Sequence, residues 1–111
     1  MQLSEKGDID RVMNSFYGND SVTAIVQLKV DTKEADTIAM NVAKHEAIFD
    51  VYMVTGDADI IVKAKFKNYS SVKKFLVDTL GSIKGVKELK TMMVVTAFKE
   101  NGQLEDIGVV R

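Results

Sequence analysis

Apolar residues recur along the chain with two different periods, one typical of strands and one typical of helices. From Val22 to Val30 nearly every second residue is apolar, which predicts a strand with one buried face. The segments 48–55, 59–67 and 88–98 are rich in β-branched and other apolar residues, and we predict strands there too. Because only a short turn with Gly56 and Asp57 separates 48–55 from 59–67, these two strands are expected to form an antiparallel hairpin.

Apolar residues three and four positions apart predict two helices between the strands. The first is expected to be capped by Asp31 or Thr32 and to run to about Lys44. The second is expected to be capped by Ser70 or Ser71 and to end at a glycine. The predicted buried faces are Ala35, Ile38, Ala39 and Val42 in the first helix, and Val72, Phe75, Leu76, Thr79 and Leu80 in the second.

Both ends of the chain carry weaker signals. Asp8 precedes apolar residues with helical spacing, which predicts a short helix. Asn101 and Gly102 form a hairpin-turn dipeptide, and the residues after them are expected to add a weak edge strand. We therefore expect a short helix and linker over 1–20, a main domain over 21–99, and a C-terminal hairpin or edge-strand extension over 100–111.

The order of elements predicts an α+β fold of the ferredoxin-like βαββαβ type, a four-stranded antiparallel sheet with two helices on one face. The uncovered face should be polar if it meets water. It is predicted to be apolar instead, so we expect a homodimer with α/β-barrel-like pairing of two sheets, and Lys63, Lys65 and Lys67 near the rim. The uncovered face is expected to carry several of Ile25, Tyr52, Met53, Val54, Met92 and Met93.

Composition narrows the classes of function. The 111 residues include no Cys and one His, so we expect neither a thiol nucleophile nor a zinc site. A net charge of −1 argues against strong binding to nucleic acid. No apolar stretch approaches the roughly 20 residues of a membrane span, and the N-terminus lacks a signal-peptide pattern, so a cytoplasmic protein is expected.

The turn around Gly56 is the strongest candidate site. Gly56 permits a positive φ and close approach of the backbone to a ligand, and exposed N–H groups of such a turn can hold a carboxylate. Asp57 and Asp59 can accept an ammonium group, so the turn suits a zwitterion such as a free amino acid. The alternative is an ordinary hairpin in which these side chains only stabilise the turn. Acid–base catalysis by the two carboxylates is the least favoured alternative.

Other candidates have simpler interpretations beside the functional one. Met53, Met92 and Met93 suit a side-chain pocket near the turn, or they fill the core or an interface. Tyr69 closes a pocket or merely packs. His45, at a helix C-terminus, is interpreted as a capping or surface residue. The alternating lysines of 59–67 are interpreted as a solvated strand face, since no aromatic residues of the RNA-binding kind interleave them.

The segment 51–63, which holds Thr55, Gly56, Asp57 and Asp59 between two strands, resembles the effector-binding (RAM-type) domain of the Lrp/AsnC family of transcription regulators. The resemblance covers about residues 21–99 and includes Gly85 followed by Val86, and Thr91. It implies the ferredoxin-like fold, dimers that pair through their sheets, octamers of four dimers, and a small effector, typically an amino acid, bound between dimers. The residues it implies for ligand binding are Met53, Thr55, Gly56, Asp57, Asp59, Tyr69, Thr91, Met92 and Met93.

This sequence differs from the family pattern in three ways. Only about 20 residues precede the first strand, where most members have a DNA-reading helix-turn-helix, so a stand-alone domain without direct nucleic-acid contact is expected. Lys84 replaces a common Pro, and Ala58 replaces a common aromatic residue. We expect a non-enzymatic sensor without catalytic residues, cofactor or metal, which acts through oligomerisation or through full-length regulators. The alternatives are a small dimeric enzyme of the monooxygenase or isomerase type and an ACT-type module.

Overall fold

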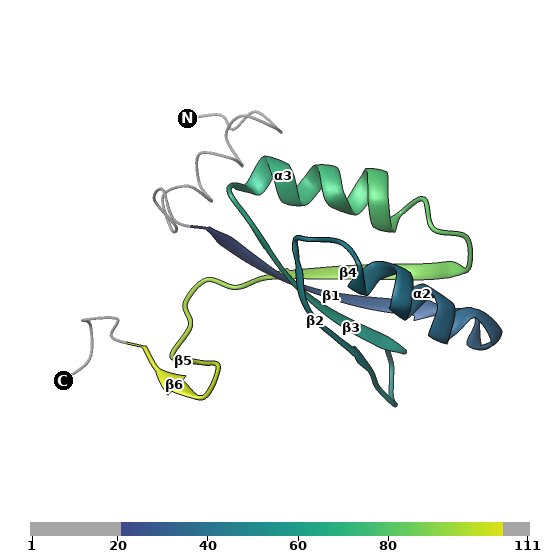
Figure 1. Cartoon of the computed structure of the whole chain (residues 1–111), viewed down its shortest axis with the longest axis horizontal. Coiled ribbons are helices and arrows are strands. Elements are labelled where there is room, and N and C mark those ends of the chain that lie inside the picture. Colours follow the sequence, from purple (N-terminus) through teal and green to yellow (C-terminus); the bar gives the residue numbers. More distant parts are fainter. Residues whose placement is uncertain (1–20, 106–111) are drawn as a thin grey trace, which may run out of the picture.

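A four-stranded antiparallel sheet in the order β2-β3-β1-β4 forms one layer of the molecule, and two helices form the other (Figure 1). The computed structural model describes residues 21–105, and the helix predicted near Asp8 lies outside them. The strands are β1 (Val22–Val30), β2 (Ile48–Met53), β3 (Ile60–Phe66) and β4 (Val86–Met93). Each strand is antiparallel to its neighbours, which confirms the predicted ferredoxin-like sheet with helices on one face.

The first helical segment begins where the sequence predicts it. Asp31 accepts a hydrogen bond from the Lys33 N–H at 3.2 Å and so caps a 3₁₀ turn, η1 (Thr32–Glu34), that leads into α2 (Ala35–Ala43). Ala35, Ile38 and Val42 are buried, as the spacing predicts.

The second helix differs from the prediction at its start and in its interior. Its cap is Asn68, whose side chain accepts the Ser71 N–H at 2.9 Å, so the prediction of a serine cap is wrong. The Ser71 hydroxyl instead bonds to the same Asn68 oxygen at 3.0 Å. After α3 (Tyr69–Lys74) the helix widens into a π-helix, η2 (Phe75–Leu80), in which the Gly81 N–H donates to the Leu76 carbonyl at 2.7 Å.

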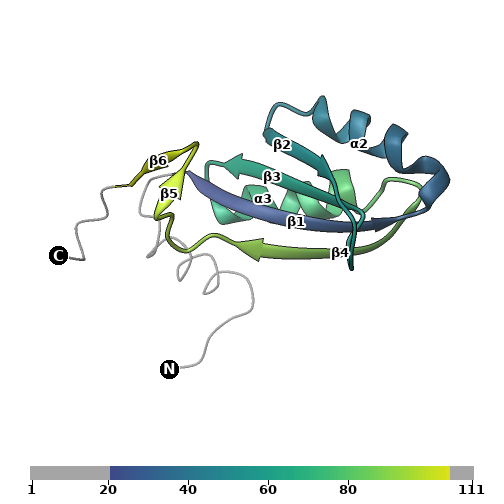
Figure 2. The same cartoon turned by 90° about the horizontal axis from the view of Figure 1, so that it is seen from below.

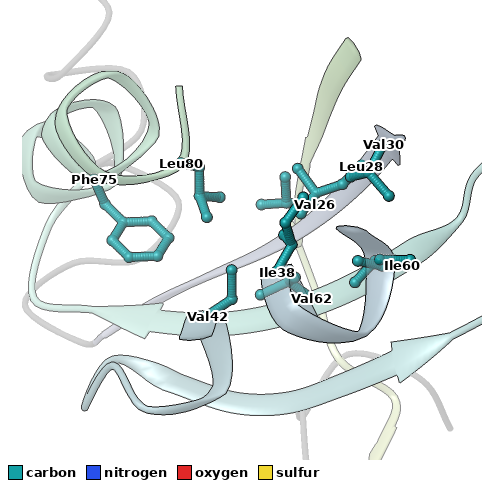
Figure 3. Packing of buried hydrophobic residues seen from close by; sticks show 10 residues of the cluster. Val26, Leu28, Val30, Ile38, Val42, Ile60, Val62, Phe75 and Leu80 are labelled. Atoms are coloured by element: carbon teal, nitrogen blue, oxygen red, sulfur yellow. The ribbon is translucent and has the colours of Figure 1, made fainter. Parts of the chain in front are cut away.

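The core lies between the helices and one face of the sheet (Figure 3). Alternate residues of the two central strands point toward the helices, so the period of two in the sequence becomes one continuous apolar layer. Removing this surface from water supplies the main driving force for folding. The central members are Val26, Leu28, Val30, Ile38, Val42, Ile60, Val62, Phe75 and Leu80.

A bulge in β2 changes which of its residues share a face. The register shifts between Ile48 and Asp50, so Val51 pairs with Val62 on the helix-covered face while Phe49 does not follow it there. Phe49 is exposed, and its ring lies 5.1 Å from the Lys65 Nζ. Unbroken alternation along this segment would place Phe49 and Val51 on the same face, and the bulge separates them.

The last long strand ends earlier than predicted. β4 stops at Met93, which pairs with Ala24 of β1, and not at Phe98. The final bond of this ladder runs from the Val94 N–H to the Thr23 carbonyl at 3.0 Å.

The C-terminal hairpin is separate from the main sheet. Strands β5 (Lys99–Glu100) and β6 (Gln103–Leu104) pair only with each other, so the prediction of an edge strand on the main sheet is wrong for these residues. The turn between them contains Asn101 and Gly102 with φ of 54° and 79°, which confirms the predicted hairpin turn. The hairpin lies at one end of the sheet, on the side away from the helices (Figures 1 and 2).

Glu100 ties this hairpin to the uncovered face of the sheet. Its carboxylate lies 3.4 Å from the Lys63 Nζ and 3.8 Å from the Lys65 Nζ. Both lysines belong to β3, an inner strand, so the prediction that they lie near the rim is wrong. None of the helices in residues 21–105 is long and apolar enough to cross a membrane.

Candidate functional site

The candidate turn joins β2 to β3 and is held at its base. The Val54 N–H donates to the Asp59 carbonyl at 2.9 Å, and the Asp59 N–H donates to the Leu28 carbonyl of β1 at 2.9 Å. The Lys29 ammonium group donates to the Asp57 carbonyl at 3.2 Å. These bonds fix the turn against the neighbouring strand, so its tip is presented in a defined conformation.

The tip of the turn is exposed and adopts a conformation that favours glycine. Gly56 has a φ of 126°, a value that L side chains rarely adopt, and a Cβ there would meet nothing within 4 Å. Thr55 and Asp57 are exposed on either side of it. Within the part of the chain that the structure describes, the N–H groups of Gly56 and Asp57 have no hydrogen-bond partner. They are therefore available to an anion from outside.

Asp59 differs from Asp57 in its surroundings. The Asp59 Oδ2 accepts the Val30 N–H at 2.9 Å, and the residue is half-buried. One of its carboxylate oxygens is therefore used to join the turn to the end of β1. Asp57 is exposed and keeps its carboxylate free of any partner within the described residues. The two carboxylates thus do not form the facing pair that acid–base catalysis would need.

Two lysines lie near the turn in the structure, and the sequence did not predict that they would. A small cavity of about 20 Å³ beside Asp57, large enough for about one water molecule, is lined also by Lys29 of β1 and by Glu88 and Lys90 of β4, so both signs of charge meet there. The register pairs Lys29 with Glu88 and Gln27 with Lys90, so both lysines point to the uncovered face. The alternation in 22–30 predicts which face of the sheet carries Lys29. That β4, with Lys90, lies next to β1 is known only from the strand order in the structure.

The other predicted ligand residues do not gather around this turn. Tyr69 follows the far end of β3, so about 20 Å of strand, at about 3.3 Å per residue, separates it from the Gly56 turn. Met93 pairs with Ala24, near the start of β1, whereas the turn bonds to Leu28 near its end. One chain therefore holds two separate groups of the predicted residues, at opposite ends of the sheet.

The methionines also point in different directions. Met92 pairs with Ile25 and lies on the uncovered face, whereas Thr91 and Met93 pair with residues whose side chains face the helices. The buried Oγ1 of Thr91 has no hydrogen-bond partner within the described residues. Met53, at the end of β2, is exposed. A single pocket in one chain cannot contain all three methionines.

The uncovered face of the sheet mixes apolar and charged side chains. Tyr52 and Met92 are about half exposed, at 56% and 48%. Ile25 and Ile61 lie between them on the inner strands. The prediction of an apolar free face is confirmed for Ile25, Tyr52 and Met92 and is wrong for Met53 and Met93, which belong to the register of the other face. The uncovered face also carries charged side chains and is not predominantly apolar: Lys29, Lys63, Lys65, Glu88 and Lys90.

His45 is neither a helix cap nor a metal ligand in this structure. Its Nδ1 accepts the Ala47 N–H at 3.1 Å, and its ring packs edge-on against Phe75 with centroids 4.7 Å apart. The interpretation as a capping residue is therefore wrong, because the imidazole serves the turn that follows the helix. Residues 21–105 contain no cluster of three or more His, Asp or Glu side chains placed to hold a metal ion.

Comparison with known sequences finds one family over most of the chain. The model of the Lrp/AsnC ligand binding domain matches residues 23–104. The HTH-type transcriptional regulator FL11 of Pyrococcus abyssi is 39% identical over 106 residues, which cover 93% of this chain and 70% of FL11. FL11 of Pyrococcus horikoshii is 39% identical over 84 residues, 76% of this chain and 55% of its own length. The chain thus matches one part of longer regulators.

Solved structures share the fold at low sequence identity. The transcriptional regulator NMB0573 of Neisseria meningitidis, in complex with L-Met, aligns with a TM-score of 0.68 at 22% identity, over 98% of this chain and 68% of that one. TTHA0845 of Thermus thermophilus aligns with a TM-score of 0.67 at 20% identity, over 71% of this chain and 99% of that one. The second structure is therefore hardly longer than the aligned domain itself.

Proposed function

Because the chain belongs to the Lrp/AsnC family of ligand-binding domains, we propose that it is a receptor for a small effector, a free amino acid, which binds at the Gly56 turn. The observation that carries this proposal is the tip of that turn. It is held rigidly at its base, yet its N–H groups and the Asp57 carboxylate have no partner within the described residues. A preorganised site loses little conformational entropy when a ligand binds.

The chemistry of the turn suits both charged groups of an amino acid. The N–H groups beside Gly56 take the α-carboxylate, and the nearby Lys29 ammonium group adds positive charge. Asp57 takes the α-ammonium group, while Asp59 mainly holds the turn in place through Val30. L-Met in the NMB0573 complex is an example of such a ligand in a protein with the same fold.

A second chain completes this site. The Gly56 turn and the group formed by Tyr69 and Met93 lie too far apart to touch one ligand within one chain. We assign the turn to one chain and the distant group to a chain of a neighbouring dimer, with dimers formed through the uncovered sheet face and up to four dimers in a ring. Because the ligand then binds between chains, its concentration and the state of assembly are linked.

The protein acts without catalysis in this proposal. The curated relatives described above are transcriptional regulators by name. Asp59 and His45, the residues best suited to proton transfer by type, both accept backbone N–H groups. The domain passes the ligand signal to other chains, which include copies of itself and full-length regulators of the family.

A thermal-shift screen of the twenty amino acids tests the proposal. A ligand at 100 times its dissociation constant stabilises the folded state by about 2.7 kcal/mol, so a true effector raises Tm measurably. The expected result is a shift with one amino acid or a few similar ones, and its loss in Asp57→Asn. The absence of any shift among the twenty would contradict the proposal.

Two matched glycine variants separate binding from folding. Gly56 and Gly102 both have positive φ, 126° and 79°, and in both cases a Cβ meets nothing within 4 Å. Gly56→Ala and Gly102→Ala therefore impose backbone strain of the same kind, but only the first lies at the proposed site. We expect ligand stabilisation to disappear in Gly56→Ala and to persist in Gly102→Ala.

A further inference from the structure

A second cavity lies on the helix side of the sheet, away from the Gly56 turn. It has a volume of about 240 Å³ and is formed where α3 and η2 pass the end of β3 and the turn after α2. Drug-sized ligands usually occupy cavities of about 300–1,000 Å³, so this one suits a smaller molecule. It is lined by His45, Phe66, Ser71, Lys74, Phe75, Asp78 and Thr79.

Aromatic side chains form the inner part of this cavity. The rings of Phe66 and Phe75 have centroids 5.2 Å apart and are tilted by 50°, and His45 meets Phe75 edge-on at 69°. Because the Nδ1 of His45 accepts the Ala47 N–H, a neutral imidazole carries its proton on Nε2 and remains a donor there. Such a cluster favours a planar apolar group that stacks or packs edge-on.

Opposite charges stand at the outer part of the same cavity. Lys74 and Asp78 are both exposed, and neither has an ion-pair partner within the described residues. Ser71 and Thr79 add hydroxyl groups beside them. A molecule with one carboxylate and one ammonium group matches this pair, whereas a simple anion meets Asp78 and a simple cation meets Lys74.

The local backbone gives an independent sign of function. Phe75, Asp78 and Thr79 lie in η2, the π-helical part of the second helix. π-helical turns are rare and frequently mark functional sites, because they shift side chains out of the positions that a regular α-helix would give them. Here the widened turn carries three of the seven lining residues.

From these features we infer that the cavity binds a small aromatic zwitterion, with its ring against Phe66 and Phe75, its carboxylate at Lys74 and its ammonium group at Asp78. L-Phe is the simplest probe with this chemistry. The site is distinct from the Gly56 turn, because β3 separates the two: the turn precedes Ile60, whereas the cavity lies beside Phe66.

The single histidine of the chain offers a clean measurement. His45 gives the only imidazole signals in an NMR spectrum, and a bound phenyl ring next to it would shift them by its ring current. We expect L-Phe to move these signals in a saturable way, with backbone changes at Phe75 and Thr79. L-Ala, which lacks the ring, and phenylacetate, which lacks the ammonium group, should bind more weakly.

Charge variants test the assignment of the two ends of the ligand. Lys74→Gln and Asp78→Asn should each weaken L-Phe binding by up to about fivefold, as expected for exposed charge pairs. Lys73→Gln is the matched control, because Lys73 is an exposed neighbour on the same helix that does not line the cavity. It should leave the affinity unchanged.

The outcomes that would overturn the inference are distinct. These are no saturable shift of the His45 signals, equal affinity for L-Phe and L-Ala, or an equal loss of affinity in Lys73→Gln and Lys74→Gln. Binding that persists in Gly56→Ala supports the second cavity whatever the fate of the Gly56 site. L-Phe shifts confined to residues 55–59 would assign the ligand to the turn and refute the cavity as its site.

Discussion

The two faces of the sheet differ in how they are completed. On the helix-covered face, Leu28 and Ile60 are fully buried by elements of the same chain. On the uncovered face, Tyr52 and Met92 stay about half exposed, and Lys63 and Lys65 are neutralised only in part by Glu100. The first face is completed within the chain, whereas the second is the face that we propose contacts another chain.

This difference separates the residues that stabilise the fold from those that we propose for binding and assembly. Core residues stabilise the folded state through buried apolar area and contribute little to recognition. The uncovered face and the Gly56 turn contribute little to stability, yet they are the surfaces that we propose for contact with another chain or a ligand. Substitutions should therefore divide into those that lower Tm and those that change assembly or binding.

The largest expected effect comes from removing a core side chain. Ile60→Ala should lower the free energy of unfolding by about 2–5 kcal/mol, because it leaves a cavity among fully buried neighbours. Tyr52→Ala on the other face should cost under about 1 kcal/mol in a monomer while shifting the assembly toward smaller species. Urea unfolding and sedimentation measure the two effects. Equal losses of stability would show that the faces do not differ.

A second prediction concerns two glycines with positive φ. Gly85 has a φ of 101°, and a Cβ there would lie 3.1 Å from the Ile38 Cδ1, whereas a Cβ on Gly102 meets nothing within 4 Å. Gly85→Ala should therefore cost about 1–3 kcal/mol and more than Gly102→Ala, since steric contact adds to the backbone strain. Thermal unfolding of the two variants side by side measures this. A smaller loss in Gly85→Ala would contradict the packing described for this loop.

The two aspartates of the turn should differ in a smaller way. Asp59→Ala leaves the half-buried Val30 N–H without its partner and should cost about 1–2 kcal/mol. Asp57→Ala should leave stability within about 0.5 kcal/mol, because its exposed carboxylate has no partner within the described residues. Chemical denaturation distinguishes them. If Asp57→Ala proved the more destabilising variant, the roles assigned to the two carboxylates would be reversed.

The smallest expected effect belongs to the C-terminal hairpin. Glu100→Gln removes the ion pairs to Lys63 and Lys65 at 3.4 and 3.8 Å. These side chains are partly buried but still reach solvent, so the pairs should contribute up to about 1 kcal/mol, and salt should weaken them. The difference in Tm between wild type and variant should therefore shrink as salt is raised. A difference that salt does not change would show that the hairpin is held by other contacts.

Local patterns in the sequence predict the strands, the helices and the Asn101 turn well, because each depends on residues close together in the chain. The departures arise where distant elements decide. The bulge in β2, which separates Phe49 from Val51, is defined by pairing with β3, and Glu100 meets Lys63 across 36 intervening residues. The start of the second helix is a local feature that the sequence still did not predict correctly. Asn68 caps this helix, two residues before Ser70, the first of the two expected caps.

The candidate site is predicted in part for the same reason. The turn with Gly56 and Asp57 is local, so its exposure and positive φ follow from the sequence. The structural role of Asp59 depends on Val30, and the basic surroundings depend on Lys90, both contributed by other strands. Tyr69 lies at the opposite end of the sheet because the whole length of β3 separates it from the Gly56 turn.

Subunit complementation tests the central claim, that the effector site is completed between chains. Gly56→Ala alters the turn and Tyr69→Ala alters the distant group, so each variant alone should fail to bind the amino acid selected by the thermal-shift screen. After the two are unfolded and refolded together, about one quarter of the sites should combine an intact turn with an intact Tyr69, if chains mix at random. Calorimetric titration of the mixture is then predicted to recover binding at that stoichiometry. Mixed assemblies that form and still fail to bind would contradict a site shared between chains.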